Sequence, residues 1–158
     1  MLDVPQFREL IIKPALTVVD GYSLAADELV LGTALQESRL IYIKQLGSGP
    51  ALGVFQMEPA THNDIWDNYL AYREELAAKV ISLAAPNGDR PSSNELIGNL
   101  WYAAAMCRIH YMRVPDALPE AGDIPGLAAY WKEFYNTFEG AGTSEEFEEN
   151  WFANMGSN

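Results

Sequence analysis

The carboxylate of Glu37 stands in an otherwise apolar helical pattern within residues 29–61. The residues that share its helical stripe are Val30, Thr33, Ala34, Leu40 and Ile41. A carboxyl group held against apolar surroundings is penalised in its charged form, so its pKa rises and it can stay protonated near neutral pH. Glu37 would then be a general acid. The alternative is a buried glutamate neutralised by an arginine such as Arg39 or Arg108, and helical spacing alone leaves both open.

The helix that carries Glu37 has recognisable ends. Ser23 is a suitable N-cap residue, and the sequence GSGP, which starts at Gly47, cannot continue a helix. Pro59 is placed to open the next helix, which is predicted to run to the turn cluster that starts at Pro86. The apolar residues of this second helix recur at spacings of three and four, namely Ile65, Tyr69, Tyr72, Leu76, Val80 and Leu83.

The remaining segments also predict helices. Residues 94–113 are apolar on much of their circumference, which predicts a buried central helix. An N-terminal helical segment within residues 1–22 is expected to end or kink at Pro14. Thr143 and Glu146 form a capping box that starts the last helix, within residues 137–158. The sequence therefore predicts a single all-α domain over residues 1–158, with little or no sheet.

The composition argues against several classes of function. The chain has a formal net charge of −12 and lacks the clustered Lys and Arg that nucleic-acid binding needs. No apolar run approaches the roughly 20 residues of a membrane span, and the N-terminus does not resemble a secretory signal. His62, Asp64 and His110 belong to no His-rich or Cys-rich cluster, so we expect no metal and no cofactor. Cys107 lies in an apolar run and is predicted to be a buried hydrophobic residue.

Three short motifs occur in order from Glu37 onwards. They are Glu37-Ser38 near a helix end, Gly53-Val54-Phe55-Gln56, and Pro59-Ala60-Thr61 at a helix start. This series resembles the signature of the lytic transglycosylase and goose-type lysozyme family, which has Glu-Ser, then Gly-Leu-Met-Gln, then a Pro-Ala-Thr helix start. The segment Leu127-Ala128-Ala129-Tyr130 resembles the family's later Ala-Tyr-Asn motif, although Trp131 follows it and a Tyr135-Asn136 pair comes later. The resemblance covers residues 23–136.

The resemblance implies a lysozyme-like fold and an enzyme that cleaves the β-1,4 bond between N-acetylmuramic acid and N-acetylglucosamine in a peptidoglycan strand. Glu37 would protonate the glycosidic oxygen. Ser38 and Gln56 would hold N-acetyl or hydroxyl groups of the sugar, and the backbone at Gly53 would lie close to it. The implied substrate-binding residues are Ser38, Gly53, Phe55, Gln56, Glu58, and Tyr130 or Tyr135. Among the other aromatic residues, we expect Trp131 or Tyr102 to stack on a sugar face.

Glu58 leaves the mechanism open. No acidic residue lies between Ser38 and Met57, so a second catalytic carboxylate would have to be Glu58, Asp64 or one from elsewhere in the chain. An inverting hydrolase places such a group roughly 6.5 to 9.5 Å from the acid, where it activates water. In lytic transglycosylases one glutamate acts as acid and then as base, while the 6-hydroxyl of the muramic acid closes on the anomeric carbon. The dipole of the following helix also explains a glutamate at this position.

The lack of a signal and of a wall-binding module favours a bacteriophage enzyme. We expect either a virion component, with tail or baseplate proteins as partners, or an endolysin, made in the host cytoplasm and acting at the bacterial cell wall. The negative charge favours the virion component, because wall polymers are often anionic. Two other classes stay open. An inactive tail or baseplate protein would have Glu37 neutralised by a salt bridge, or a cleft filled by Trp131 or Phe55. A glycan-binding module would bind without turnover.

Overall fold

The computed structural model describes residues 1–84, 88–136 and 141–155. The described residues are mostly helical, at 64%. The described residues hold no sheet, since extended segments pair only through isolated bridges from Leu52 to Lys44 and to Met57. The prediction of a single all-α domain is confirmed, and its lysozyme-like character stays a prediction. Within these ranges no helix has the length and apolar character needed to cross a membrane.

Helix α3 (Leu24–Ser38) runs through the core and carries Glu37 in its last turn. Ser23 caps its start as predicted, because the backbone N–H of Ala26 donates to Ser23 Oγ at 3.1 Å. All residues from 26 to 35 are buried. The helix ends at Arg39, whose φ of 53° is left-handed. The carboxylate is therefore fixed on an element that the core holds on all sides.

The N-terminal segment forms α1 (Val4–Phe7), a π-helical turn (Arg8–Ile12) and α2 (Lys13–Val18). The helix does not end at Pro14, and the local distortion is the π-helical turn just before it. Pro14 has no N–H to donate to the carbonyl of Leu10. The indole Nε1 of Trp101 donates to that oxygen at 2.9 Å. A side chain from a distant helix thus satisfies the carbonyl that the proline leaves free.

The predicted helix over residues 94–113 is in fact two helices. They are α6 (Glu95–Gly98) and α7 (Leu100–Met112), separated by Asn99 in an extended conformation. The side chain of Asn99 accepts the backbone N–H of Tyr102 at 3.0 Å, so this residue caps α7 instead of continuing α6. The prediction of a buried helix in this part of the chain is confirmed for α7, in which eight of thirteen residues are buried.

The predicted helix after Pro59 is also interrupted. It consists of α4 (Pro59–Asn68), a 3-10 turn (Leu70–Tyr72) and α5 (Glu74–Ser82). Tyr72 lies on the predicted apolar stripe but is 78% exposed, whereas Leu70 lies off that stripe and is 1% exposed. The 3-10 turn changes the direction in which the following side chains point. The apolar spacing in the sequence therefore does not correspond to one continuous helical face. Pro86 and Asn87, at the start of the predicted turn cluster, lie outside the described residues.

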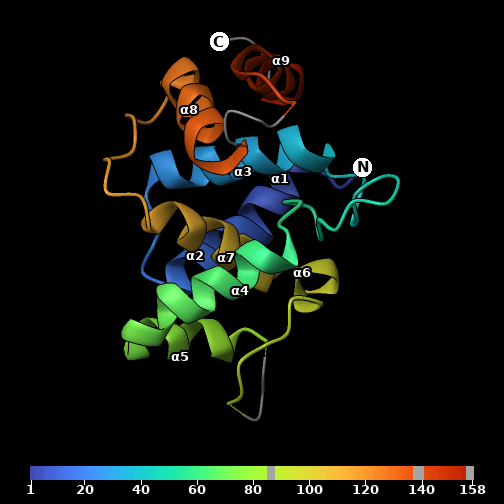
Figure 1. Ribbon diagram of the computed structural model, residues 1–158. Helices are drawn as coiled ribbons and strands as arrows, with labels where there is room; N and C mark the ends of the chain where they lie inside the picture. Colours follow the sequence, from blue (N-terminus) through green and yellow to red (C-terminus); the bar gives the residue numbers. More distant parts are fainter. Residues whose placement is uncertain (85–87, 137–140, 156–158) are drawn as a thin grey trace.

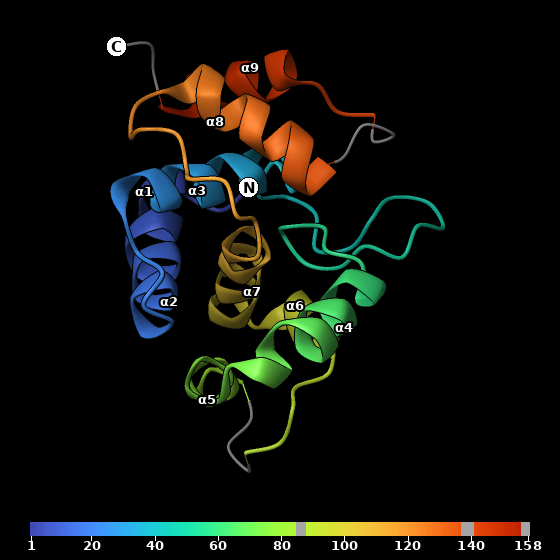
Figure 2. The same cartoon turned by 60° about the vertical axis from the view of Figure 1, so that its left-hand side comes forward.

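The C-terminal part consists of α8 (Ile124–Trp131), a π-helical segment (Lys132–Asn136) and α9 (Ser144–Met155). The predicted capping box is confirmed, because the backbone N–H groups of Thr143 and Glu146 each donate to the other residue's side chain, at 3.0 and 3.2 Å. Residues 137–140 and 156–158 of the predicted last segment lie outside the described ranges. Figures 1 and 2 show α8 and α9 packed across α3, on the side opposite to α4 and α5.

Candidate active site

A cavity of about 790 Å³ lies beside the C-terminal end of α3. Its wall also includes parts of residues 42–57, the start of α4, α7 and the π-helical segment after α8. The residues of the wall that bear on chemistry are Glu37, Arg39, Gln56, Glu58, His110, Tyr135 and Asn136. Segments that are distant in the sequence therefore meet around the carboxylate that the sequence singled out.

Glu37 is partly buried and points a carboxyl group at this cavity. Burial raises its pKa to about 7, against a smaller opposing effect of the hydrogen bond from Trp131. Among the described residues Glu37 makes no salt bridge. Arg108 instead donates its Nε to the carbonyl of Gly21 at 2.8 Å, and Arg39 is exposed without an ion-pair partner in the described ranges. The carboxyl group can thus hold a proton near neutral pH.

Trp131 has a role that the sequence did not suggest. Its side chain is 0% exposed, and its indole Nε1 donates to Oε1 of Glu37 at 3.0 Å. Tyr102, the other residue expected to stack on a sugar, is also 0% exposed and hydrogen-bonds to His62 Nε2 at 2.7 Å. Neither ring offers a face to a ligand, so both stacking predictions are wrong. No local signal connects Trp131 with Glu37, because 94 residues separate them.

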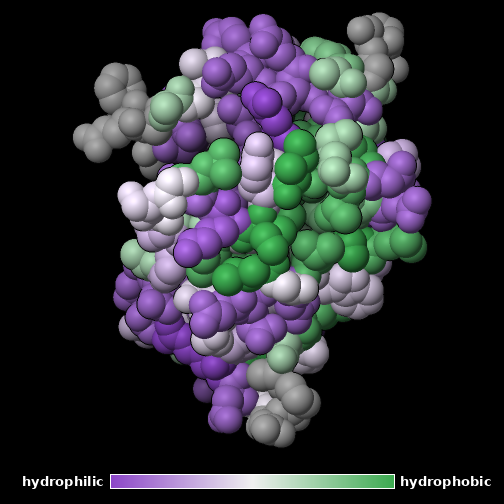
Figure 3. Space-filling view, turned by 90° about the vertical axis from the view of Figure 1, so that its right-hand side faces the viewer, coloured by the Kyte–Doolittle hydropathy of each residue, from purple (hydrophilic) through white to green (hydrophobic). Residues whose placement is uncertain are grey.

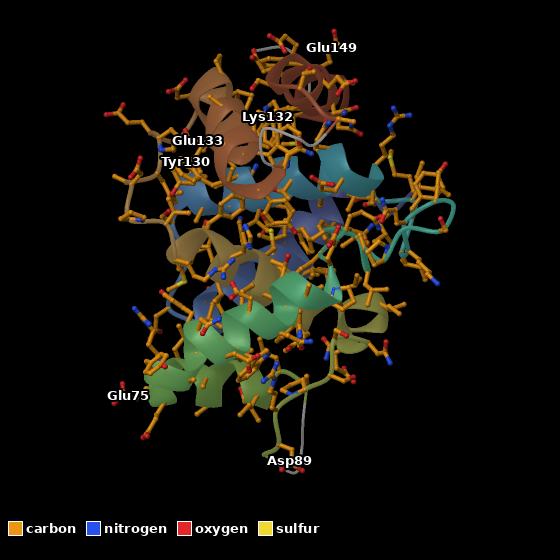
Figure 4. The ribbon with its side chains drawn as sticks, in the orientation of Figure 1. Glu75, Asp89, Tyr130, Lys132, Glu133 and Glu149 are labelled. Carbon is orange, nitrogen blue, oxygen red and sulfur yellow. The ribbon has the colours of Figure 1, made fainter. Side chains whose placement is uncertain are left out.

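The two candidate tyrosines lie in different surroundings. Tyr135 is part of the cavity wall, and its hydroxyl donates to the carbonyl of Phe55 at 2.8 Å. Tyr130 is not part of that wall: its hydroxyl donates to the carbonyl of Asp116 at 2.9 Å. Figure 4 labels it on the side of α8 that faces the connection from α7. Of the two tyrosines named from the sequence, Tyr135 is therefore the one beside Glu37.

The π-helical segment Lys132–Asn136 explains this difference. A π turn closes hydrogen bonds between residues five apart and is therefore wider than an α turn. It brings Tyr135 and Asn136 to the cavity wall, four and five residues after Trp131. The Tyr130 ring packs instead against Tyr111 and Phe134, with centroid separations of 5.9 and 4.6 Å.

Gly53 positions Gln56 and does not itself face the cavity. Its φ is +72°, and a Cβ placed on it would lie 2.0 Å from the backbone oxygen of Leu96. The missing side chain therefore makes room for α6, which corrects the expectation that it makes room for substrate. The carbonyl of Gly53 accepts Gln56 Nε2 at 2.7 Å. Within the described residues the Oε1 of Gln56 has no hydrogen-bond partner, which leaves an acceptor on the cavity wall.

Phe55 and Ser38 have structural contacts in place of the ligand contacts expected of them. The Phe55 ring is 1% exposed and packs against Phe7 at a centroid distance of 6.2 Å, so it neither lines nor fills the cavity. The Ser38 hydroxyl donates to the carbonyl of Ala34 and accepts the backbone N–H of Leu40, both at 3.1 Å. Ser38 belongs to the cavity wall, but its hydroxyl is engaged in hydrogen bonds with the backbone at the end of α3.

Glu58 supplies a second carboxylate to the wall. It is exposed, immediately precedes α4 and makes no capping hydrogen bond with its side chain. Its carboxylate is free to interact with a ligand or with water. Two carboxyl groups in different surroundings, one partly buried and one exposed, can take the roles of acid and base in one site.

His110 is a wall residue that was not predicted to belong to the site. In the described structure its Nε2 donates to the carbonyl of Phe134 at 2.8 Å, and Arg113 donates to its Nδ1 at 3.0 Å. Arg113 also pairs with Asp64 of α4. Burial lowers the pKa of His110 to about 4, so the ring is neutral at pH 7. This chain of contacts links α4 and α7 to the segment that carries Tyr135.

Metal and thiol chemistry have no visible basis in the described residues. No group of three His, Cys, Asp or Glu side chains there could hold a metal ion. Cys107 is 0% exposed, which confirms that it is buried, and burial raises the pKa of its thiol. An uncharged, enclosed thiol is a poor nucleophile. Among the described wall residues, Glu37 and Glu58 remain as the candidate acid and base.

A second hollow, of about 410 Å³, lies on the face shown in Figure 3, where hydrophobic side chains gather. Its wall contains no carboxylate, imidazole or thiol. The residues of that wall are Met1, Leu2, Leu40, Ile41, Ile43, Val54, Ile97, Gly98 and Leu100. It offers no acid or base, so the cavity beside Glu37 is the better candidate for catalysis.

Comparison with known proteins adds no relative to this description. No family model, no curated protein and no solved structure matches the chain.

Proposed function

We propose that this protein cleaves the β-1,4 bond between N-acetylmuramic acid and N-acetylglucosamine in peptidoglycan, with Glu37 as the general acid. One observation carries the proposal: a carboxyl group with a pKa of about 7 lies on the wall of a large cavity and makes no salt bridge within the described residues. A group with this pKa is protonated in a substantial fraction of molecules at pH 7 and is basic enough to take a proton back.

In the proposed reaction the Glu37 carboxyl protonates the glycosidic oxygen, and the bond from that oxygen to the anomeric carbon breaks. The resulting Glu37 carboxylate then accepts a proton from the group that attacks the anomeric carbon. If that group is water, the product has a reducing end. If it is the 6-hydroxyl of the same muramic acid, the product is an anhydro sugar. In the first case Glu58 is the candidate for activating water, and it would then accept the proton of that water in place of Glu37.

The positions of Gln56, Tyr135 and Asn136 support this reading. The lytic transglycosylase and goose-type lysozyme family, which the motifs resemble, has a Gln and a Tyr-Asn pair in the segments that these residues occupy. All three belong to the cavity wall. Gln56 is held by Gly53 and Tyr135 by the backbone of Phe55, so both side chains are fixed before a substrate arrives.

The inactive structural protein is less well supported. That reading expects Glu37 to be neutralised by a cation or the cleft to be filled by Trp131 or Phe55. Neither side chain belongs to the cavity wall, and no cation pairs with Glu37 in the described ranges. A place in a phage tail or baseplate, or release as an endolysin, belongs to the proposal as a setting in which such an enzyme would reach the wall.

Digestion of purified peptidoglycan by the wild type and by Glu37→Gln, with mass spectrometry of the soluble products, tests the proposal. We expect fragments from the wild type only. Anhydromuramic ends indicate transglycosylation, and reducing muramic ends indicate hydrolysis. No release by either protein, when glycan binding remains, would favour the binding module. Release by both at the same rate would remove Glu37 from the mechanism.

A further inference from the structure

Most Lys and Arg side chains of this chain have an interaction partner in the described structure. Ten Lys and Arg residues face 22 Asp and Glu residues, and all ten lie within the described ranges. The cations in ion pairs are Arg8, Lys13, Lys79, Arg90 and Arg113. Those with other partners are Arg73, Arg108 and Lys132. Within the described ranges, only Arg39 and Lys44 have a side chain without an ion pair, a hydrogen bond or a ring contact. Of these two, Arg39 belongs to the cavity wall and Lys44 does not.

The backbone holds Arg39 in one place. Its N–H donates to the carbonyl of Leu35 at 3.1 Å, and the next residue, Leu40, is 3% exposed in the core. The Oγ of Ser38 accepts the N–H of Leu40. Both neighbours in the sequence are buried, whereas Arg39 is exposed. Its side chain therefore leaves a rigid helix end at the edge of the cavity that contains Glu37.

This position is costly for an arginine. The φ of Arg39 is 53° and that of Leu40 is 52°, whereas helix ends of this kind favour glycine at the left-handed residue. A side chain there costs about 1 kcal/mol relative to glycine. The helix dipole attracts a cation, but an arginine one turn earlier would satisfy it without left-handed backbone. Backbone strain of this kind is typical of binding sites.

The cavity is also unusual in its charge. Among the described residues of its wall, the charged side chains are Glu37, Arg39 and Glu58, while burial keeps His110 neutral. When Glu37 carries the proton that it donates, the charges of Arg39 and Glu58 cancel. The chain as a whole has a net charge of −12. In the described part of the cavity wall, an anionic glycan thus meets a guanidinium without an ion-pair partner and no excess of negative charge.

We propose that Arg39 binds a carboxylate carried by the glycan strand next to the bond that Glu37 attacks. The inference rests on the proposed function and names the feature of the substrate that the cavity selects. Peptidoglycan offers this chemistry in two forms. The lactyl group of muramic acid carries a free carboxylate when the stem peptide is absent, and the stem peptide carries its own carboxylates when it is present. Arg39 separates such glycans from neutral chitin-type strands, which have the same backbone.

Binding measurements on the Glu37→Gln protein test this without consuming the ligand. The probes are a neutral N-acetylglucosamine tetrasaccharide, a peptide-free tetrasaccharide that alternates N-acetylglucosamine with N-acetylmuramic acid, and the latter with stem peptides. Adding Arg39→Gln is expected to raise Kd about tenfold for the carboxylate-bearing probes, in a salt-dependent way, and to leave the neutral probe within about twofold. Arg39→Lys keeps the charge but loses the planar fork, so it should lie in between.

Lys44→Gln is the matched control, because Lys44 is the other cation without a described partner and lies outside the cavity wall. It should change no Kd by more than about twofold. An effect of Arg39→Gln on the peptide-free probe alone assigns the lactyl carboxylate, and an effect on the peptide-bearing probe alone assigns the stem. An equal loss for all three probes, no loss for any, or an equal effect of Lys44→Gln overturns the proposal.

The proposed function can fail separately. If no probe binds the Glu37→Gln protein with Arg39 intact and the wild type releases no fragments, the cavity is not a peptidoglycan site, and both proposals are wrong. If the wild type cleaves peptidoglycan, Glu37→Gln does not, and Arg39→Gln leaves every Kd unchanged, the function stands and the role of Arg39 is wrong.

Discussion

The indole Nε1 of Trp131 donates to Oε1 of Glu37 at 3.0 Å, from a ring that is 0% exposed. This contact fixes the carboxyl group and stabilises its charged form. Burial acts in the opposite direction and is the larger effect, so the pKa of Glu37 is about 7. The balance of these two effects sets the pH range in which Glu37 can donate a proton.

Replacing Trp131 by Phe should move the pH range of activity upward. Loss of the donor destabilises the carboxylate, so the pKa of Glu37 rises further, and the basic limb of kcat/KM moves up by about one pH unit. The smaller ring also leaves a void, which should lower the free energy of unfolding by about 1 to 3 kcal/mol. A pH–rate profile on soluble glycan strands measures the limb. A limb that stays in place or moves to lower pH contradicts this assignment.

Glu37→Gln should stabilise the protein at alkaline pH. The pKa of Glu37 is raised from 4.5 to about 7 on folding, so the folded state keeps a proton that the unfolded chain loses between these values. The contribution of Glu37 to the free energy of unfolding is therefore fully present below pH 4.5. It is lost as the pH rises towards 7, by about 3 kcal/mol in total. The variant lacks this loss. Urea unfolding at pH 4 and pH 8 should show a gain over the wild type at pH 8 only, and an equal gain at both values is the contrary result.

Tyr135→Phe and Tyr130→Phe form a matched pair. Each removes a hydroxyl that donates to a backbone carbonyl, so each should cost about 1 kcal/mol of folding free energy. Tyr135 lies on the cavity wall and its hydroxyl donates to the Phe55 carbonyl. Loss of this hydroxyl should therefore lower kcat/KM about tenfold. Tyr130→Phe should stay within about twofold. Rates on purified peptidoglycan decide the matter, and the reverse order would place the wrong tyrosine at the site.

Arg39→Gly should stabilise the fold while it removes the cation from the cavity. The left-handed φ of 53° suits glycine, so we expect the free energy of unfolding to rise by about 0.5 to 1 kcal/mol. Arg39→Gln keeps the strained backbone and should show no such gain. Thermal and urea unfolding of both variants measure the difference. Destabilisation by Arg39→Gly would mean that the side chain supports the fold.

The residues that cap the helices were predictable from the sequence, and the positions at which long helices are interrupted were not. The Ser23 cap and the Thr143–Glu146 capping box depend on residues three apart, which a sequence shows directly. The break at Asn99 interrupts a continuous apolar pattern, because burial selects residue type and does not require an unbroken backbone. The 3-10 turn that buries Leu70 and exposes Tyr72 likewise interrupts a helix within a continuous apolar pattern.

The candidate site shows the same division. Glu37, Gln56 and Glu58 lie close together in the sequence, and the structure brings all three to one wall. The contact of Glu37 with Trp131 and the hydrogen bonds of His110 depend on how α3, α7 and α8 pack, which no short segment encodes. The choice of Tyr135 over Tyr130 depends on a π-helical turn, whose extra residue per turn has no clear composition signal.

The rate at which Glu37→Gln releases fragments from purified peptidoglycan, measured beside Glu58→Gln and the wild type, tests the central claim most directly. If Glu37 is the general acid, its variant should lose at least about 10³-fold in rate while remaining folded. Glu58→Gln should retain activity if the products are anhydro sugars and lose it if water is the nucleophile. A Glu37→Gln protein that cleaves at the wild-type rate would contradict the account, whatever Glu58→Gln does.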